Sequence, residues 1–172
     1  MNHYGKTCCF IGHRKTEETP SLKAELRRVL CDLTEKGADT FIFGDHSEFN
    51  TLCYNEVTKL KNEYPQIRRI KFRKDYQDID ENTKKYFLDG YEDNICPDSI
   101  ANAGKAAYVQ RNRAMIDTSD CCIFYYDENY KPERRKETKR SLTDYQPKSG
   151  TRLAFEYAKS KNKTIINIFK AK

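Results

Sequence analysis

Short apolar runs that alternate with helical patterns constrain this fold more than any other feature of the chain. The runs are TCCFIG at 7–12, TFIFG at 40–44, CCIFYY at 121–126 and TIINIF at 164–169. Apolar runs of this length, bounded by turn residues, are typical of strands buried on both faces. Strands of that kind occur in parallel sheets that helices cover on both sides, so the alternation indicates an α/β protein.

Amphipathic segments separate the runs. Thr19 and Pro20 have the pattern of a helix start, and Gly37 that of a helix end. An apolar stripe at helical spacing lies between them: Leu22, Leu26, Val29, Leu30 and Leu33. Further helices are expected at about 50–63, 100–118 and 149–161. We therefore predict one Rossmann-like domain over residues 1–172, with a mostly parallel five-stranded sheet and helices on both faces.

Three segments fit this alternation less simply. Residues 67–72 alternate apolar side chains with Arg and Lys, which predicts a strand with one wet face whose charges protect a sheet edge. For residues 75–100 we expect a short helix at 82–88 and then a loop. Residues 127–148 form a charged insertion without apolar periodicity, and we interpret it as a lid or a partner surface.

Composition limits the classes of function. The 172 residues suit one domain, and the net charge of +6 suits an anionic partner, either a small phosphorylated ligand or a polymer. Of the seven cysteines, Cys8–Cys9 and Cys121–Cys122 are neighbours. Adjacent strand side chains point to opposite faces, so neither pair can chelate one metal ion, and we predict buried, reduced thiols. Residues 1–6 lack the apolar core of a signal peptide, which favours a cytoplasmic protein that does not bind membranes.

Two glycine-ended strands supply the first candidate site residues. Ligands of open parallel sheets bind at the carboxyl ends of the strands. Gly12, His13 and Arg14 follow the first strand: glycine allows close approach, and arginine offers a fork of donors that matches phosphate. His13 is either an acid–base group or a hydrogen-bonded turn residue. Gly44 and Asp45 follow the second strand, where Asp45 could accept hydrogen bonds from ribose hydroxyls or cap the next helix.

Two later segments complete the candidate site. Arg111–Asn112–Arg113 lies late in the predicted helix at 100–118, where two arginines could grip a phosphate or form a solvated face. Ser149, Gly150 and Thr151 begin a helix, which is either an anion site or an ordinary cap. The sequence has no zinc-ligand spacing, no G-x-S-x-G elbow and no G-x-G-x-x-G fingerprint, so we expect neither a metal site nor a conventional NAD cofactor.

Taken in order, these motifs resemble those of the SLOG superfamily. The stretches that carry the likeness are 8–14, Gly44 with Phe49–Asn50, Leu60–Lys61 with Tyr64–Pro65, the R-N-R-x-M-x-D block at 111–120, and 149–151 with Tyr157–Ala158. This superfamily includes the DprA/Smf proteins and the LOG nucleotide phosphoribohydrolases, and the chain is most similar to the stand-alone bacterial YpsA-like proteins. The resemblance implies a Rossmann-like fold and a nucleotide-related ligand, and such relatives often self-associate.

The chain departs from the LOG enzymes at their catalytic position. Aligning Gly150–Thr151 with the LOG motif places Ala154 where those enzymes have glutamate. Alanine cannot stabilise a ribosyl cation or carry a proton. Glu156 lies about 200° further around the same helix and points elsewhere. The LOG reaction is therefore not expected here.

The leading hypothesis is binding of a phosphate-bearing, nucleotide-derived molecule (a nucleotide, an ADP-ribose-like compound or a cyclic signal) in a sensory or regulatory role. Residues 149–151 would hold the phosphate, with Arg14 and Arg111 as counter-charges. One alternative is a hydrolase of an N-glycosidic or phosphate bond, with His13, Asp45 or Glu156 as base. A second is DprA-like nucleic-acid binding by the basic residues in 68–74 and 131–140.

Overall fold

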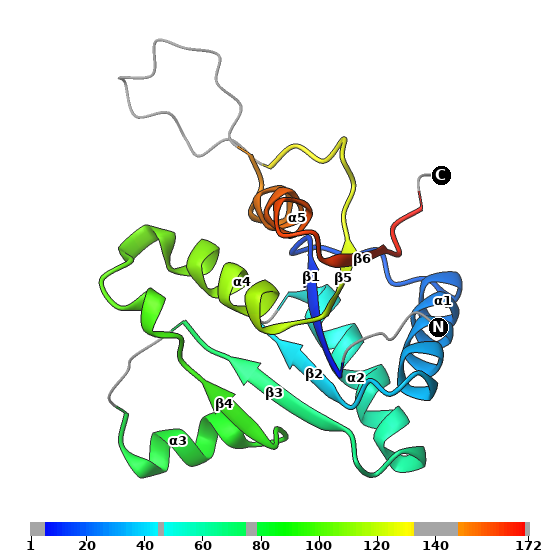
Figure 1. Ribbon diagram of the computed structural model, residues 1–172, viewed down its shortest axis with the longest axis horizontal. Coiled ribbons are helices and arrows are strands. Elements are labelled where there is room, and N and C mark those ends of the chain that lie inside the picture. Colours follow the sequence, from blue (N-terminus) through cyan, green and yellow to red (C-terminus); the bar gives the residue numbers. More distant parts are fainter. Residues whose placement is uncertain (1–5, 45–46, 75–78, 133–147, 171–172) are drawn as a thin grey trace.

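A single parallel sheet organises the chain (Figure 1). The computed structural model describes residues 6–44, 47–74, 79–132 and 148–170. Its six strands lie in the order β4-β3-β2-β1-β5-β6, and all neighbours pair in parallel. The strands are β1 (Thr7–Gly12), β2 (Thr40–Phe43), β3 (Arg68–Phe72), β4 (Asp93–Ile95), β5 (Cys121–Tyr125) and β6 (Thr164–Asn167). The predicted α/β class is confirmed, but the predicted number of five strands was wrong.

The strand missing from the prediction is β4. Its three residues include one apolar side chain, Ile95, so periodicity gave no sign of a strand where we expected a loop. Pairing of Ile70 with Asp93 and of Phe72 with Ile95 holds β4 beside β3. Because β4 covers β3, the latter is an interior strand, and its basic side chains do not protect a sheet edge.

Helices cover both faces of the sheet (Figure 1). Helices α1 (Pro20–Glu35) and α2 (Glu48–Glu63) lie on one face, and α4 (Ala107–Thr118) and α5 (Gly150–Ser160) lie on the other. Helix α3 (Glu81–Leu88) packs beside β4. Short 3-10 turns occupy Asp98–Ile100 and Gly104–Ala106. None of the helices in the described ranges combines the length and apolar character needed to cross a bilayer.

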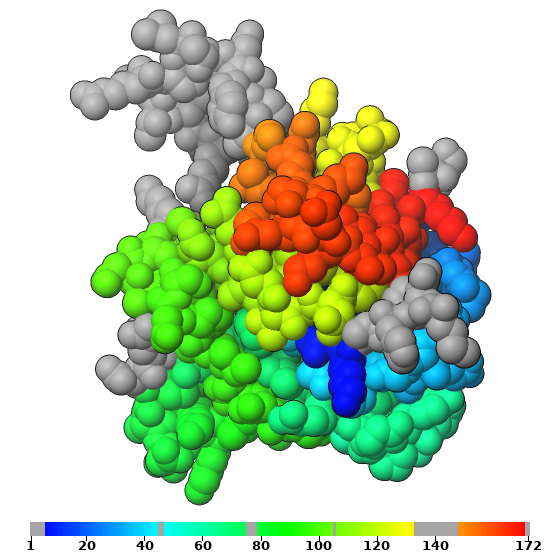
Figure 2. Space-filling view, in the orientation of Figure 1, coloured from blue at the N-terminus to red at the C-terminus, as the bar shows by residue number. Residues whose placement is uncertain are grey.

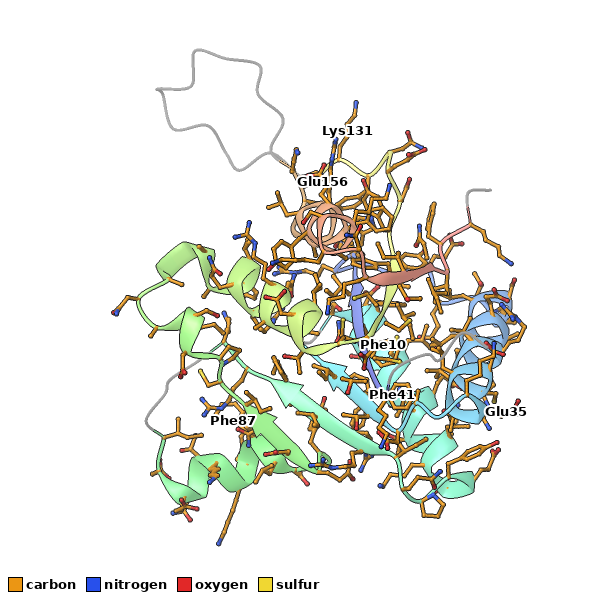
Figure 3. All side chains as sticks on the ribbon, in the orientation of Figure 1. Phe10, Glu35, Phe41, Phe87, Lys131 and Glu156 are labelled. Atoms are coloured by element: carbon orange, nitrogen blue, oxygen red, sulfur yellow. The ribbon has the colours of Figure 1, made fainter. Side chains whose placement is uncertain are left out.

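The core has two layers because neighbouring strand residues face opposite sides of the sheet. Cys8 and Phe10 pack with α1 and α2, whereas Cys9 and Ile11 pack with α4 and α5. Figure 3 shows the labelled Phe10 and Phe41 inside the molecule, and their stacked rings lie 5.9 Å apart. All seven cysteines lie in the described residues and none forms a disulfide; five are buried, as predicted, whereas Cys31 and Cys96 are half-buried.

The helix starts determine which residues lie near the carboxyl ends of the strands. Thr19 caps α1 as expected, since its hydroxyl accepts the N–H of Leu22 at 3.1 Å. Ser47 caps α2, which therefore begins at Glu48 rather than near residue 50. Helix α4 begins at Ala107, after the two 3-10 turns, rather than at about residue 100. Arg111 is thus early in its helix, and the prediction that it lies late was wrong.

Candidate functional site

The candidate site lies along the carboxyl ends of β2, β1 and β5. The strand order reverses at β1, because β2 lies on one side of it and β5 on the other. Crossover helices between parallel strands run opposite to those strands, so α4 and α5 both begin at this edge. Ligands of open α/β sheets bind at such a reversal point. We call this edge the rim.

Arg111 and Gly44 meet on the rim. The Arg111 side chain is only 5% exposed. Its guanidinium atoms lie 3.2 Å from the point where a Cβ on residue 44 would stand. The fold therefore brings together two residues that the sequence suggested separately. Glycine at position 44 leaves the space that the planar guanidinium group fills.

Asn50 holds the turn on which Arg111 rests. Its Oδ1 accepts the backbone N–H of Gly44 at 3.1 Å, and its own N–H donates to the Ser47 hydroxyl at 3.1 Å. Both side chains are buried. Asn50 entered the sequence analysis only as part of the Phe49–Asn50 pair in the family resemblance, and its structural role was missed. The sequence signal that could have indicated this role is Ser47, a helix-capping serine three residues before Asn50.

A cation–aromatic cluster extends the rim beyond β3. The Arg111 Cζ atom lies 5.3 Å from the centre of the Tyr108 ring, and the Lys74 Nζ atom lies 4.0 Å from the same centre. Lys74 also donates to the Tyr108 hydroxyl at 2.5 Å. Two positive groups therefore lie close to one ring. A concentration of positive charge in a partly desolvated position attracts anions. Sequence reasoning missed Lys74 and Tyr108 as partners of Arg111.

The start of α5 contributes backbone donors on the same face of the sheet. The Ser149 hydroxyl accepts the N–H of Arg152 at 3.1 Å, so Ser149 is the helix cap. Gly150 borders open space, and Thr151 is buried. The first N–H groups of a helix lack intrahelical partners, and the helix dipole favours negative charge there.

Arg111 and Gly150 both lie towards the starts of their helices, α4 and α5. Met115 and Ala154 belong to one apolar cluster between these helices and the sheet. Arg111 precedes Met115 by four residues, and Gly150 precedes Ala154 by four. Four residues of helix rise about 6 Å, so each lies about 6 Å nearer the start of its helix than the cluster residue that follows it. Figure 2 shows α4 and α5 (yellow-green and orange) as adjoining parts of one surface.

Gly12 and Arg14 have different surroundings from those we expected. A Cβ on Gly12 would lie 2.4 Å from Cδ1 of Phe49, so the glycine accommodates a buried ring of α2. Arg14 is exposed, and its carbonyl oxygen accepts the N–H of Glu48 at 3.0 Å. The packing of Phe49 explains glycine at position 12, and ligand contact by Gly12 or Arg14 stays a prediction.

His13 is buried between β1 and the segment after β5. Its Nε2 accepts the backbone N–H of Asp127 at 2.9 Å, and its ring lies 4.1 Å from that of Tyr130. Burial lowers the pKa of His13, which favours the neutral ring. Because Nε2 accepts a hydrogen bond, we assign the proton to Nδ1. The basic lone pair is engaged, so this geometry disfavours His13 as a general base.

Several other candidates lie away from the rim or outside the described residues. The guanidinium group of Arg113 lies over the Tyr157 ring at 5.1 Å, so Arg111 and Arg113 do not grip one anion. The Glu156 carboxylate pairs with Lys148 and Arg152, and Figure 3 shows Glu156 at the outer surface. Ala154 is buried. Asp45 and most of the 127–148 insertion (133–147) lie outside the described residues.

The basic run of β3 is largely engaged in protein contacts. Arg69 donates to Glu92 through Nη2 at 2.8 Å and through Nε at 3.2 Å. Arg73 donates to Asn94 at 2.9 Å. These pairs secure β4 against β3. Because Arg69 and Arg73 make these contacts, fewer of the basic side chains are available to bind a nucleic acid than the sequence indicated. Nucleic-acid binding stays a prediction.

Comparison with known proteins bears on the identity of the fold. A family model, YpsA, described as the YspA SLOG family, matches residues 8–161. No curated protein sequence matches the chain significantly. The matched range begins in β1 and ends just after α5, so it includes the rim strands and both helices that begin there. This chain therefore belongs to the YpsA family of SLOG proteins.

Proposed function

We propose that the protein binds a phosphate-bearing, nucleotide-derived small molecule on the rim. Its membership of the SLOG family supports a nucleotide-related role. The position of the rim at the strand-order reversal supports the location. The phosphate would lie between the start of α5 and Arg111, and the remainder of the ligand would extend along the ends of β1 and β2.

The observation that carries this proposal is the burial of Arg111 at the strand ends. Arg111 is only 5% exposed, so its guanidinium group has lost most of its hydration, and its Nη2 donates to Oδ1 of Asn112 at 3.1 Å. Its fork of donors matches phosphate oxygens. Lys74, whose Nζ atom lies 4.0 Å from the centre of the same Tyr108 ring, adds to the positive potential. The backbone donors of residues 150 and 151 would complete an anion site.

Binding is favoured over hydrolysis by the state of two candidate bases. The His13 lone pair accepts a backbone N–H, and Glu156 is held by two cations on the outer side of α5. The hydrogen bonds from Lys148 and Arg152 lower the pKa of Glu156, which makes it a weaker proton acceptor. We therefore propose a binding role, with regulation or sensing as its consequence.

Calorimetry with a matched pair of variants tests the proposal. The ligands are AMP, ADP-ribose and cyclic di-AMP, with adenosine as the phosphate-free control. We expect Arg111→Ala to weaken binding of the phosphorylated ligand at least tenfold. Arg113→Ala removes the same charge from the exposed side of α4 and should leave affinity within twofold. Equal binding of adenosine and AMP, or equal effects of the two variants, would refute a phosphate site at Arg111.

A further inference from the structure

Four buried cysteines lie side by side on β1 and β5. The two strands pair in parallel, with Cys8 opposite Cys121 and Cys9 opposite Cys122. Cysteines that are neighbours in the sequence face opposite sides of the sheet, whereas partners across the two strands share a face. Cys8 and Cys121 belong to the core layer under α1 and α2, and Cys9 and Cys122 belong to the layer under α4 and α5. The fold therefore creates two cross-strand thiol pairs that the sequence does not show.

The pair formed by Cys8 and Cys121 has a spacing that a disulfide can bridge. Neighbouring strands of a sheet lie about 4.7–4.9 Å apart. The Cα atoms of disulfide-linked residues are usually about 4.4–6.8 Å apart. Cys8 and Cys121 are in register on adjacent strands, and a hydrogen bond already joins their thiols. A bond between the two sulfur atoms therefore requires no change in the register of β1 and β5.

The two thiols of this pair differ in acidity. Their shared hydrogen bond raises the pKa of Cys8, and burial raises it further. The same hydrogen bond lowers the pKa of Cys121, against the opposing effects of burial and of the Asp120 charge. Cys121 therefore loses its proton before Cys8 does. Because the thiolate is the nucleophile in thiol oxidation, Cys121 is the reactive member of the pair and Cys8 is the second thiol.

The pair lies close to the surface at the amino ends of its strands. Both side chains are fully buried, but Thr7, which precedes Cys8, is half-buried, and Asp120, which precedes Cys121, is exposed. Thr7 and Asp120 exchange two hydrogen bonds, at 2.9 and 3.1 Å. Strand ends open locally at a lower free energy than the core. Opening of these two hydrogen bonds gives a small neutral oxidant a route to the thiols.

We propose that Cys8 and Cys121 form a reversible disulfide when hydrogen peroxide oxidises the protein. The Cys121 thiolate attacks one peroxide oxygen, the O–O bond breaks, and the departing hydroxide takes up a proton to give water. The resulting Cys121 sulfenic acid is attacked by the Cys8 sulfur, and the S–O bond breaks. The second hydroxide takes the Cys8 proton and leaves as water. Two thiols thus lose two electrons, which reduce one peroxide to two waters, and the product is an uncharged bond that suits a buried layer.

Peptide mapping of the peroxide-treated full chain tests this inference. We expect the tryptic peptide that contains Cys8 to be linked to the one that contains Cys121, and dithiothreitol to separate them. The double variant Cys9→Ala/Cys122→Ala should form the same link, because it keeps only the proposed pair on these strands. Absence of the link in both proteins, under conditions that oxidise the half-buried Cys31, overturns the inference. A link that dithiothreitol does not break also overturns it.

Two further variants in that double-variant background assign the roles of the thiols. Cys8→Ala should leave Cys121 as a sulfenic acid that dimedone labels, whereas Cys121→Ala should leave Cys8 unlabelled. Cys53→Ala is the matched control, because Cys53 is equally buried but lies in α2, and the link should still form. Labelling of Cys8 without labelling of Cys121 overturns the assignment of the nucleophile. Loss of the link in Cys53→Ala overturns the pairing. Oxidation should be unchanged in Arg111→Ala, since the rim lies at the opposite ends of β1 and β5 and this inference does not depend on it.

Discussion

The guanidinium group of Arg111 occupies the space where a side chain on Gly44 would begin. Its Cζ, Nε and Nη2 atoms each lie 3.2 Å from the ideal Cβ position of residue 44. Gly44 is the residue directly after β2, and Arg111 reaches it from the second turn of α4. Because residue 44 has no side chain, the buried Arg111 guanidinium group can lie directly against the end of β2.

The first prediction concerns this contact. Gly44→Ala should push the Arg111 side chain outward by a few tenths of an ångström and destabilise the fold by about 1 kcal/mol, as crowding of a packed site does. Ligand affinity at the rim should fall several-fold. Urea denaturation in a double-mutant cycle checks the cause, because Gly44→Ala should cost little in the Arg111→Ala background. An equal cost in both backgrounds would show that Arg111 is not the group displaced.

A second prediction concerns Gly12. A Cβ here would lie within 2.9 Å of three Phe49 atoms, and that ring is fully buried. Gly12→Ala should therefore destabilise the protein by roughly 1–3 kcal/mol, since neither group can move without disturbing the core. Gly150→Ala is the control: its Cβ meets open space at the first position of α5, so stability should stay level or rise. Similar unfolding midpoints for the two variants would contradict the packing argument.

Sequence reasoning predicted the strands that carry their own apolar run. The runs at β1, β2 and β5 are buried, and the stripe from Leu22 to Leu33 became the inner face of α1. Strand β4 could not be predicted in this way, because Asp93 and Asn94 have no apolar period. Its strand conformation depends on pairing with β3 and on the contacts between Arg69 and Glu92.

The candidate site was predicted less completely than the fold. The order of the motifs indicated Gly44 and Arg111 as site residues. Two 3-10 turns precede α4, which therefore begins later than predicted, and the predicted position of Arg111 late in the helix was wrong. Lys74 and Tyr108 are far apart in sequence and meet only because β3 ends beside α4. No local pattern records contacts that the tertiary fold creates.

A third prediction concerns acid stability through Glu92. Burial raises the pKa of Glu92, but the hydrogen bonds and charge of Arg69 outweigh it and lower the pKa from 4.5 to about 2. The folded state thus holds its proton more weakly than the unfolded state. Its stabilisation is present above pH 4.5 and is lost as the pH falls toward 2, with a total on the order of 2 kcal/mol.

Urea denaturation of Glu92→Gln at several pH values checks this effect. The stability gap between the natural protein and the variant should be largest at pH 7 and should shrink steadily below pH 4.5. Glu128→Gln, which changes an exposed carboxylate after β5, is the matched control. If the difference in stability between the natural protein and Glu92→Gln does not change with pH, the ionised Glu92 carboxylate does not contribute stability through Arg69.

The last prediction concerns the proton on His13. Since the pKa of His13 is lowered, the unfolded chain binds more protons than the folded protein just below pH 6.5. The stability that His13 contributes is therefore present above pH 6.5 and is lost as the pH falls toward the folded pKa. His13→Gln can still offer an acceptor to the Asp127 N–H and should remove this pH dependence. His13→Ala leaves that N–H without its acceptor, which should cost about 1–3 kcal/mol at every pH.

Long-range proton–nitrogen NMR spectra at pH 7 should show a neutral ring with its proton on Nδ1. A proton on Nε2 would exclude the hydrogen bond from Asp127 and return His13 to the candidates for general base.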